Sequence, residues 1–118
     1  MRTYLIEPQL VFADYLRRCL SGAGYDVIAT SAEVDGRDLV AHDPAAVFVD
    51  VDFFERGGPN ALCKIRQAMP HVRLIVFSAF EDATYAASCY ISGADAMISK
   101  TGAEENVVAD LRRLVGIQ

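Results

Sequence analysis

The feature of this sequence that most constrains its fold is a regular alternation of short apolar runs with longer amphipathic stretches. The apolar runs have the length of β-strands and fall at residues 3–6, 25–29, 45–49, 74–77 and 96–98. Each is followed by a stretch with apolar residues at helical spacing, at residues 10–20, 31–41, 62–69, 83–91 and 107–115. We therefore expect five strands alternating with five helices in one domain that spans residues 1–118.

Such alternation predicts right-handed βαβ units and a parallel sheet that is covered by helices on both faces. The runs at residues 47–49 and 74–77 are apolar at every position, which is typical of strands buried on both faces. The order 2-1-3-4-5 is common for five-stranded sheets of this type and places the first strand beside the third. We predict an α/β, flavodoxin-like, doubly wound sheet with this order.

Composition narrows the class of protein further. Of the 118 residues, 53% are hydrophobic, and 16 acidic side chains outnumber 11 basic ones, giving a net charge of −5. This apolar content excludes a disordered tail, and the acidic balance argues against binding to nucleic-acid phosphates. No apolar run approaches the ~18 residues that cross a bilayer. The three cysteines lack metal-ligand spacing, so we expect reduced thiols and a cytoplasmic protein with no membrane contact.

Polar side chains stand at the carboxyl ends of four predicted strands. They are Glu7, Asp50, Ser78 and Lys100, and Asp52 lies two residues beyond Asp50. The carboxyl ends of parallel strands meet at one edge of the sheet, where ligands bind at the point of reversed strand order. With the order 2-1-3-4-5, Glu7 and Asp50 face each other at that point.

This set of side chains suggests a particular chemistry. Two neighbouring carboxylates repel each other unless a cation or a proton lies between them, so Glu7 and Asp50 indicate a hard divalent ion such as Mg²⁺. Lys100 adds a positive charge and Ser78 a hydroxyl donor, and together they form a cradle for a tetrahedral anion on or beside Asp50. Because phosphoryl transfer requires positioning and charge neutralisation above all, these residues are equipped to accept a phosphoryl group.

Four segments resemble, in order and spacing, the signature blocks of two-component response-regulator receiver domains. They read LIE at residues 5–7, VFVD at 47–50, LIVFSA at 74–79 and GADAMISK at 93–100. The resemblance covers essentially the whole chain. The part from Ser78 through Lys100, with the helix that ends at residues 111–114, is most similar to the NarL/FixJ branch of that family.

The resemblance implies a role for each residue. Asp50 would be the phosphoacceptor, which takes a phosphoryl group from the phosphohistidine of a histidine kinase or a phosphotransfer protein. Lys100 and Ser78 would bind that group, and Glu7, Asp50 and the backbone carbonyl of Asp52 would bind Mg²⁺. Such domains are regulatory modules of phosphorelay signalling, with no enzymatic activity beyond self-catalysed phosphotransfer and dephosphorylation.

Three positions depart from the family pattern. Pro8 stands where the family has a second acidic residue, usually a direct metal ligand, so we expect weaker Mg²⁺ binding, with Asp52 partly restoring the missing charge. Met97 stands at the aromatic switch position of the fifth strand, where a thioether can repack but cannot swing a ring. The loop after Asp50 lacks the usual Met-Pro pair and carries Phe53 and Phe54, which we expect to cover the site or meet a partner.

Two functions therefore stay open. The first is a phosphorylatable receiver that switches a partner surface formed by the fourth helix, fifth strand and fifth helix. The second is a pseudo-receiver, an interaction module regulated by binding or dimerisation with weak or no phosphorylation. We expect contact with DNA only through a second domain outside this chain, and we leave open a homodimer through the first and fifth helices or through the fourth-to-fifth face. An unrelated flavodoxin-like binding domain is disfavoured because the phosphate-cradling run of Gly, Ser and Thr expected after the first strand is absent.

Overall fold

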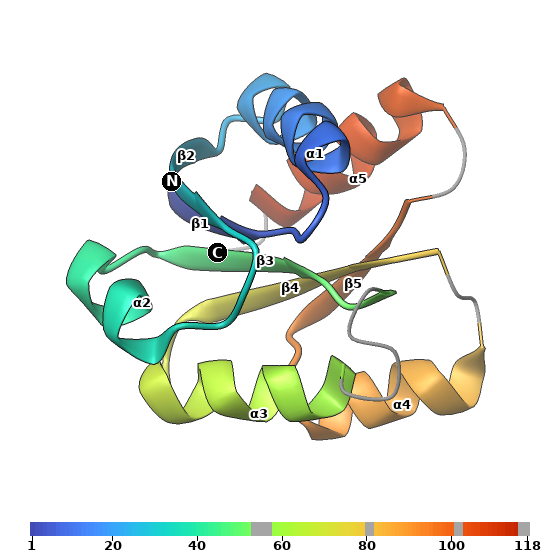
Figure 1. Cartoon of the computed structure of the whole chain (residues 1–118). Helices are drawn as coiled ribbons and strands as arrows, with labels where there is room; N and C mark the ends of the chain where they lie inside the picture. The colour runs from blue at the N-terminus through green and yellow to red at the C-terminus, as the bar shows by residue number, and fades with distance from the viewer. Residues whose placement is uncertain (53–57, 80–81, 101–102, 116–118) are drawn as a thin grey trace.

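A computed structural model describes residues 1–52, 58–79, 82–100 and 103–115 of the chain. The strands are β1 (Arg2–Ile6), β2 (Asp26–Ser31), β3 (Ala46–Asp50), β4 (Arg73–Ser78) and β5 (Ala96–Ser99). The helices are α1 (Leu10–Gly22), α2 (Gly36–His42), α3 (Gly58–Ala68), α4 (Ala83–Ile91) and α5 (Glu104–Val115). All strand pairs are parallel and the order is β2-β1-β3-β4-β5, which confirms the predicted fold (Figure 1).

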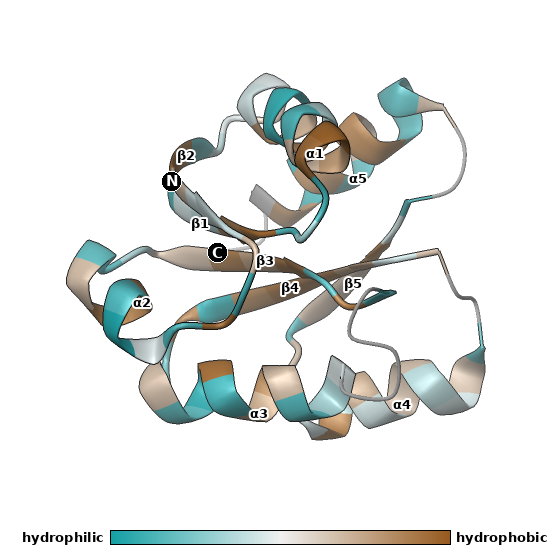
Figure 2. Ribbon diagram, viewed as in Figure 1, coloured by the Kyte–Doolittle hydropathy of each residue, from teal (hydrophilic) through white to brown (hydrophobic). Residues whose placement is uncertain are grey.

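The sheet separates two apolar layers. Helices α1 and α5 cover one face, and α2, α3 and α4 cover the other (Figure 1). Alternate residues of the central strands enter the two layers: in β3, Phe48 packs on the α1/α5 side, and Val47 and Val49 pack on the opposite side. Every residue of β3 is buried, as expected for a strand covered on both faces. Figure 2 shows apolar colours along much of the central strands, whereas the helices carry both polar and apolar colours.

The second predicted helix begins later in the chain than expected. Ser31, the first residue of the predicted helix, is the last residue of β2 and pairs with Ile6 of β1. Helix α2 begins at Gly36 because Asp35 caps it, accepting hydrogen bonds from the backbone N–H groups of Arg37 and Asp38. The apolar spacing alone did not separate the end of the strand from the start of the helix.

Arg66 of α3 connects the loops that precede β4 and β5. Its Nη1 donates to the carbonyl of Val72 at 2.7 Å, and its Nη2 donates to the carbonyl of Gly93 at 2.6 Å and to Asp95 at 3.1 Å. Gly93 has φ +121°, and a Cβ there would lie 3.1 Å from Arg66 Nε. The turn before β5 therefore requires glycine for both its backbone conformation and its space.

Candidate functional site

The carboxyl ends of β1, β3, β4 and β5 bring the predicted polar residues to one edge of the sheet. Glu7 follows β1 directly, and its backbone N–H donates to Ser31 of β2 at 2.8 Å. Asp50 ends β3 and pairs with Phe77, while Ser78 ends β4. Lys100 follows β5, and its backbone N–H donates to the carbonyl of Ser78 at 3.0 Å. The strand-end residues thus lie where the sequence placed them.

Asp50 is a fully buried carboxylate that accepts hydrogen bonds from Lys100 and from the backbone of Asp52. Its side chain has 0% exposure. Its Oδ2 accepts a hydrogen bond from Lys100 Nζ at 2.7 Å, and its Oδ1 accepts one from the backbone N–H of Asp52 at 3.1 Å. A buried charge is tolerated when it is paired and hydrogen-bonded in this way.

The side chain of Asp52 lies in the cradle predicted for an anion. Its Oδ1 accepts from Ser78 Oγ at 2.8 Å, and its Oδ2 accepts from the backbone N–H of Ala79 at 2.9 Å and from Lys100 Nζ at 2.6 Å. That this carboxylate partly restores the charge missing at Pro8 stays a prediction; in the structure its two oxygens accept from these three donors. Apart from its position two residues after Asp50, no pattern in the sequence indicates this arrangement.

Lys100 is the shared cation of the two aspartates. Its side chain is 10% exposed. Burial lowers the pKa of Lys100, but hydrogen bonds and charge attraction from Asp50 and Asp52 outweigh burial and hold the pKa above its usual value. The ring centroid of Phe12 on α1 lies 5.2 Å from Nζ, within the range of a cation–π contact. Phe12 was not among the predicted site residues, because its position on α1 does not indicate a contact with Lys100.

Glu7 is buried beside Asp50, with 3% exposure. Its carboxylate accepts from the backbone N–H of Gln9 at 3.0 Å through Oε1. Its Oε2 is buried, and no N–H or O–H group within the described part of the chain donates to it. Burial, then a hydrogen bond to Asp50 that only the protonated acid can donate, raises the pKa of Glu7 to about 8. The pair therefore holds a proton near neutral pH, or attracts a cation in its place.

The oxygen atoms at this edge would give a metal ion fewer protein ligands than the family pattern does. Pro8 offers no side-chain oxygen, and within the described residues no group of three or more His, Cys, Asp or Glu side chains is arranged to hold a metal ion. One feature does suit a cation: Glu7 Oε2 accepts no hydrogen bond from the described residues and lies beside the carboxylate of Asp50. Mg²⁺ commonly binds through one or two carboxylates and keeps several waters, so this set suits a weak site.

The remaining predicted features lie near the site or outside the described residues. Met97 is partly buried and packs in the apolar layer beneath β4 and β5, with Tyr85 of α4 in the same layer. Burial, and then nearby groups that include Asp52 and Asp50, raises the pKa of Tyr85 to about 12, so its hydroxyl stays neutral. Phe53 and Phe54 lie outside the described residues, and so does the end of the chain from residue 116.

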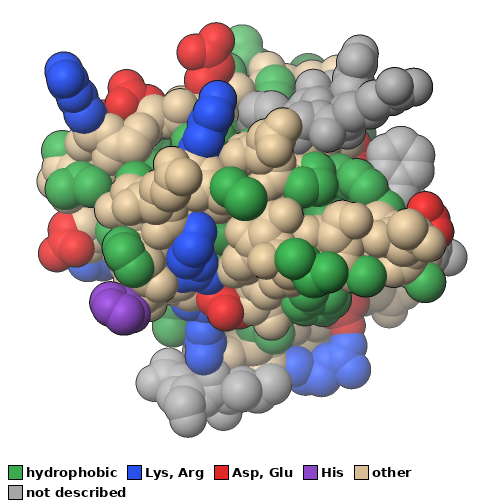
Figure 3. Space-filling model, turned by 90° about the horizontal axis from the view of Figure 1, so that it is seen from below, with side chains coloured by type: hydrophobic (Ala, Val, Ile, Leu, Met, Phe, Trp, Pro, Cys, Tyr) green, Lys and Arg blue, Asp and Glu red, His purple; other side chains and the backbone are tan. Residues whose placement is uncertain are grey.

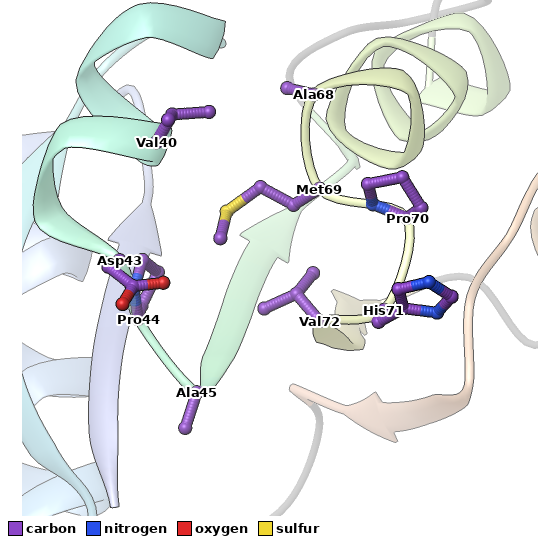
Figure 4. A pocket seen from close by; sticks show the side chains of 9 residues that line it. All are labelled: Val40, Asp43, Pro44, Ala45, Ala68, Met69, Pro70, His71 and Val72. Carbon is purple, nitrogen blue, oxygen red and sulfur yellow. The ribbon is translucent and has the colours of Figure 1, made fainter.

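A cavity and a mixed surface lie elsewhere on the described part of the molecule. A cavity of about 420 Å³ between α2 and the end of α3 is lined by Val40, Met69 and Val72 among others (Figure 4), and lies beside the amino ends of β3 and β4, away from Asp50. The face over α3 and α4 intersperses acidic, basic and apolar side chains in its coloured part (Figure 3). Across the described segments, no helix is long and apolar enough to span a membrane.

The doubly wound sheet and the aspartate, lysine and serine at its carboxyl edge define a class of regulatory α/β domains. The family model described as "Response regulator receiver domain" matches residues 4–112. The chain therefore belongs to the response-regulator receiver family of two-component systems, which confirms the resemblance. Its placement in the NarL/FixJ branch stays a prediction.

Curated relatives carry the same family description, and solved structures share the fold. The chain is 27% identical over 116 residues to the response regulator MprA of Mycobacterium avium (strain 104), covering 98% of this chain and 51% of that protein. It thus spans about half the length of the curated relatives it matches. A LuxR-family two-component response regulator from Aurantimonas sp. SI85-9A1 shares the fold, with a TM-score of 0.84, 22% identity and coverage of 99% of this chain and 86% of that one. The response regulator domain of Thermotoga maritima CheB has a TM-score of 0.80 at 17% identity, covering 99% and 94%.

Proposed function

We propose that Asp50 is the phosphoacceptor of this receiver domain and takes a phosphoryl group from the phosphohistidine of a histidine kinase or a phosphotransfer protein. The observation that supports this most is the pairing of buried Asp50 with Lys100, beside the hydroxyl of Ser78 and the backbone N–H of Ala79. An ammonium, a hydroxyl and an amide N–H are the donors that neutralise developing charge on transferred phosphoryl oxygens.

The transfer step requires a carboxylate nucleophile and a cationic neighbour. An oxygen of Asp50 forms a bond to phosphorus while the bond from phosphorus to the imidazole nitrogen breaks, and the electron pair of that bond stays on the nitrogen. Lys100 neutralises the phosphoryl oxygens, and Ser78 and the Ala79 N–H orient them. In this role the domain is a regulatory phosphoacceptor rather than an enzyme that turns over a separate substrate.

Mg²⁺ is the cofactor that we propose for this step. Glu7, Asp50 and the backbone carbonyl of Asp52 would hold it, and when bound it would neutralise charge on the transferred group. Because Pro8 supplies no carboxylate, we expect half-saturation at a higher Mg²⁺ concentration than a site with a third carboxylate would need. The buried Oε2 of Glu7, which accepts no hydrogen bond from any residue that the structure describes, supports a cation at this position.

A pseudo-receiver is the second candidate function. Two observations favour it: Pro8 stands at the position of an expected ligand, and the Asp52 carboxylate already occupies the anion cradle. In that case the domain would signal through binding or dimerisation. Exposed apolar side chains on α1 and α4, Leu10, Val11 and Ile91 among them, offer surfaces for such contacts.

The two candidates are separated by phosphorylation in solution. The chain is incubated with acetyl phosphate or phosphoramidate over a Mg²⁺ series and examined by intact mass spectrometry. We expect an adduct of one phosphoryl group that requires Mg²⁺ and is lost in Asp50→Asn. We also expect Pro8→Asp to lower the Mg²⁺ concentration needed. No adduct at any Mg²⁺ concentration, with no binding of fluoroberyllate, would leave the pseudo-receiver.

Partners beyond the phosphoryl donor depend on the longer proteins to which such domains belong. The curated relatives are about twice the length of this chain and are named response regulators. We propose that any contact with DNA is made by a further domain, and that the switched surface is formed by α4, β5 and α5. The free state of Cys19, Cys63 and Cys89 supports a reducing, cytoplasmic setting.

A further inference from the structure

Three hydrogen-bond donors from separate parts of the site converge on the single carboxylate of Asp52. Lys100 Nζ comes from the end of β5, Ser78 Oγ from the end of β4, and the Ala79 N–H from the loop that follows. Their distances to Asp52 lie between 2.6 and 2.9 Å, the range of charge-assisted hydrogen bonds. An anion is therefore already bound where a phosphoryl group on Asp50 would need its donors.

We propose that Asp52 is a built-in occupant of the phosphoryl cradle, and that its carboxylate must leave before Asp50 can be phosphorylated. This inference rests on the proposed function, because it assigns the same three donors to the transferred group. It makes Asp52 a positioning residue that sets how readily the site accepts an anion.

A phosphoryl group on Asp50 would have to compete with Asp52 for Lys100. Lys100 Nζ lies 2.7 Å from Asp50 Oδ2 and 2.6 Å from Asp52 Oδ2, so one ammonium serves both carboxylates. The side chain of Asp50 has no exposed surface, whereas that of Asp52 is 11% exposed and lies at the rim. Asp52 can thus rotate toward solvent, and Asp50 cannot reach a donor molecule until its neighbours move.

After transfer, the phosphoryl group and the Asp52 carboxylate compete for the same donors, and the more highly charged group binds them. A phosphoryl group carries about −1.5 to −2 charges and three acceptor oxygens, against one charge and two oxygens on the Asp52 carboxylate. It can therefore displace Asp52 once it is attached to Asp50. Before transfer, however, each incoming anion must break the hydrogen bonds to Asp52. The expected consequence is slow phosphorylation and a phosphorylated state weakened by the displaced carboxylate nearby.

Two substitutions at position 52 test this proposal. Asp52→Ala removes the occupant, and Asp52→Asn keeps its size without its charge. Asp26→Ala, which removes an exposed acid at the far end of β2, controls for net charge. The affinity for fluoroberyllate at saturating Mg²⁺ is measured by ¹⁹F NMR, and the rate of phosphorylation by acetyl phosphate is measured by intact mass.

We expect Asp52→Ala to raise both the affinity and the rate by about tenfold or more, since charged hydrogen bonds no longer have to be broken. The affinity and rate of Asp52→Asn should lie between those of Asp52→Ala and the wild type. If the alanine variant fails to fold, the comparison of Asp52→Asn with the wild type is the test. Asp26→Ala should behave as the wild type. Equal values for wild type and both position-52 variants would overturn this inference and leave the proposed function standing. No binding or adduct in any of them would overturn both.

Discussion

The Nζ of Lys100 and the Oδ2 of Asp50 form a 2.7 Å ion pair in which the carboxylate is wholly buried. This pair connects the end of β5 to the end of β3 across the intervening strand β4. It places an ammonium beside the proposed phosphoacceptor. The stability of the edge and its chemistry therefore depend on the same contact.

Removing the ammonium should destabilise the fold. We expect Lys100→Met to lower the free energy of unfolding at neutral pH by about 3 kcal/mol, because it leaves the charge of Asp50 buried without a counter-ion. The measurement is chemical denaturation followed by circular dichroism. The matched control is Lys64→Met, the exposed second lysine, which should stay within about 0.5 kcal/mol of the wild type. If adding Asp50→Asn to Lys100→Met recovered none of the loss, the ion pair would not be its cause.

Glu7 should make the stability of the metal-free domain depend on pH. Its pKa is raised from 4.5 to about 8 in the folded state, so between these values the folded chain keeps a proton that the unfolded chain releases. Stability contributed by this group is complete below about pH 4.5 and is lost as the pH rises through about 8. We measure denaturation in a chelating buffer at about pH 9. There the free energy of unfolding of Glu7→Gln should exceed that of the wild type by on the order of 3 kcal/mol. Glu33→Gln, at an exposed site, should leave the pH profile unchanged.

Arg66 should contribute to stability through its carbonyl partners rather than its ion pair. Its guanidinium donates to the carbonyls of Val72 and Gly93 and to Asp95. We expect Arg66→Ala to cost about 2–3 kcal/mol, since partly buried carbonyls lose charged donors. Arg18→Ala breaks only an exposed pair with Asp14 and should cost less than about 0.5 kcal/mol. Thermal unfolding of both variants decides this, and equal losses would contradict the assigned role of Arg66.

Gly58, the first residue of α3, should not tolerate a side chain. A Cβ at this position would collide with the hydroxyl of Tyr85 and would lie 3.2 Å from Val51 Cβ. We expect Gly58→Ala to cost about 1–3 kcal/mol through overpacking. Because the collision is with the hydroxyl, Tyr85→Phe should reduce that cost in the double variant. A purely additive double variant would place the strain elsewhere.

Most of the fold followed from the apolar runs. Val47, Val49 and Phe77 lie in stretches that are apolar at every position, and such stretches leave few alternatives to buried parallel strands. The start of α2 was misplaced because Asp35, the capping residue, stands within a polar stretch that also fits a helix. Caps are decided by local hydrogen bonds, which apolar spacing does not report.

The strand-end residues were predictable, but their partners were not. Glu7, Asp50, Ser78 and Lys100 occupy strand ends, and strand order then fixes that they meet. The orientation of the Asp52 side chain depends on Ser78 and Lys100, donors at the ends of β4 and β5 that are distant in sequence. The contact of Phe12 with Lys100 likewise arises from the packing of α1 against the edge. Such tertiary contacts carry no periodic signal along the chain.

The most direct test of Asp50 as the phosphoacceptor is chemical trapping of the modified residue. After phosphorylation by acetyl phosphate with Mg²⁺, borohydride reduces an acyl phosphate on aspartate to homoserine, which peptide mass spectrometry can locate. We predict homoserine at position 50 alone, and none in Asp50→Asn. Homoserine at position 52, or a phosphorylated chain without homoserine at position 50, would contradict the account.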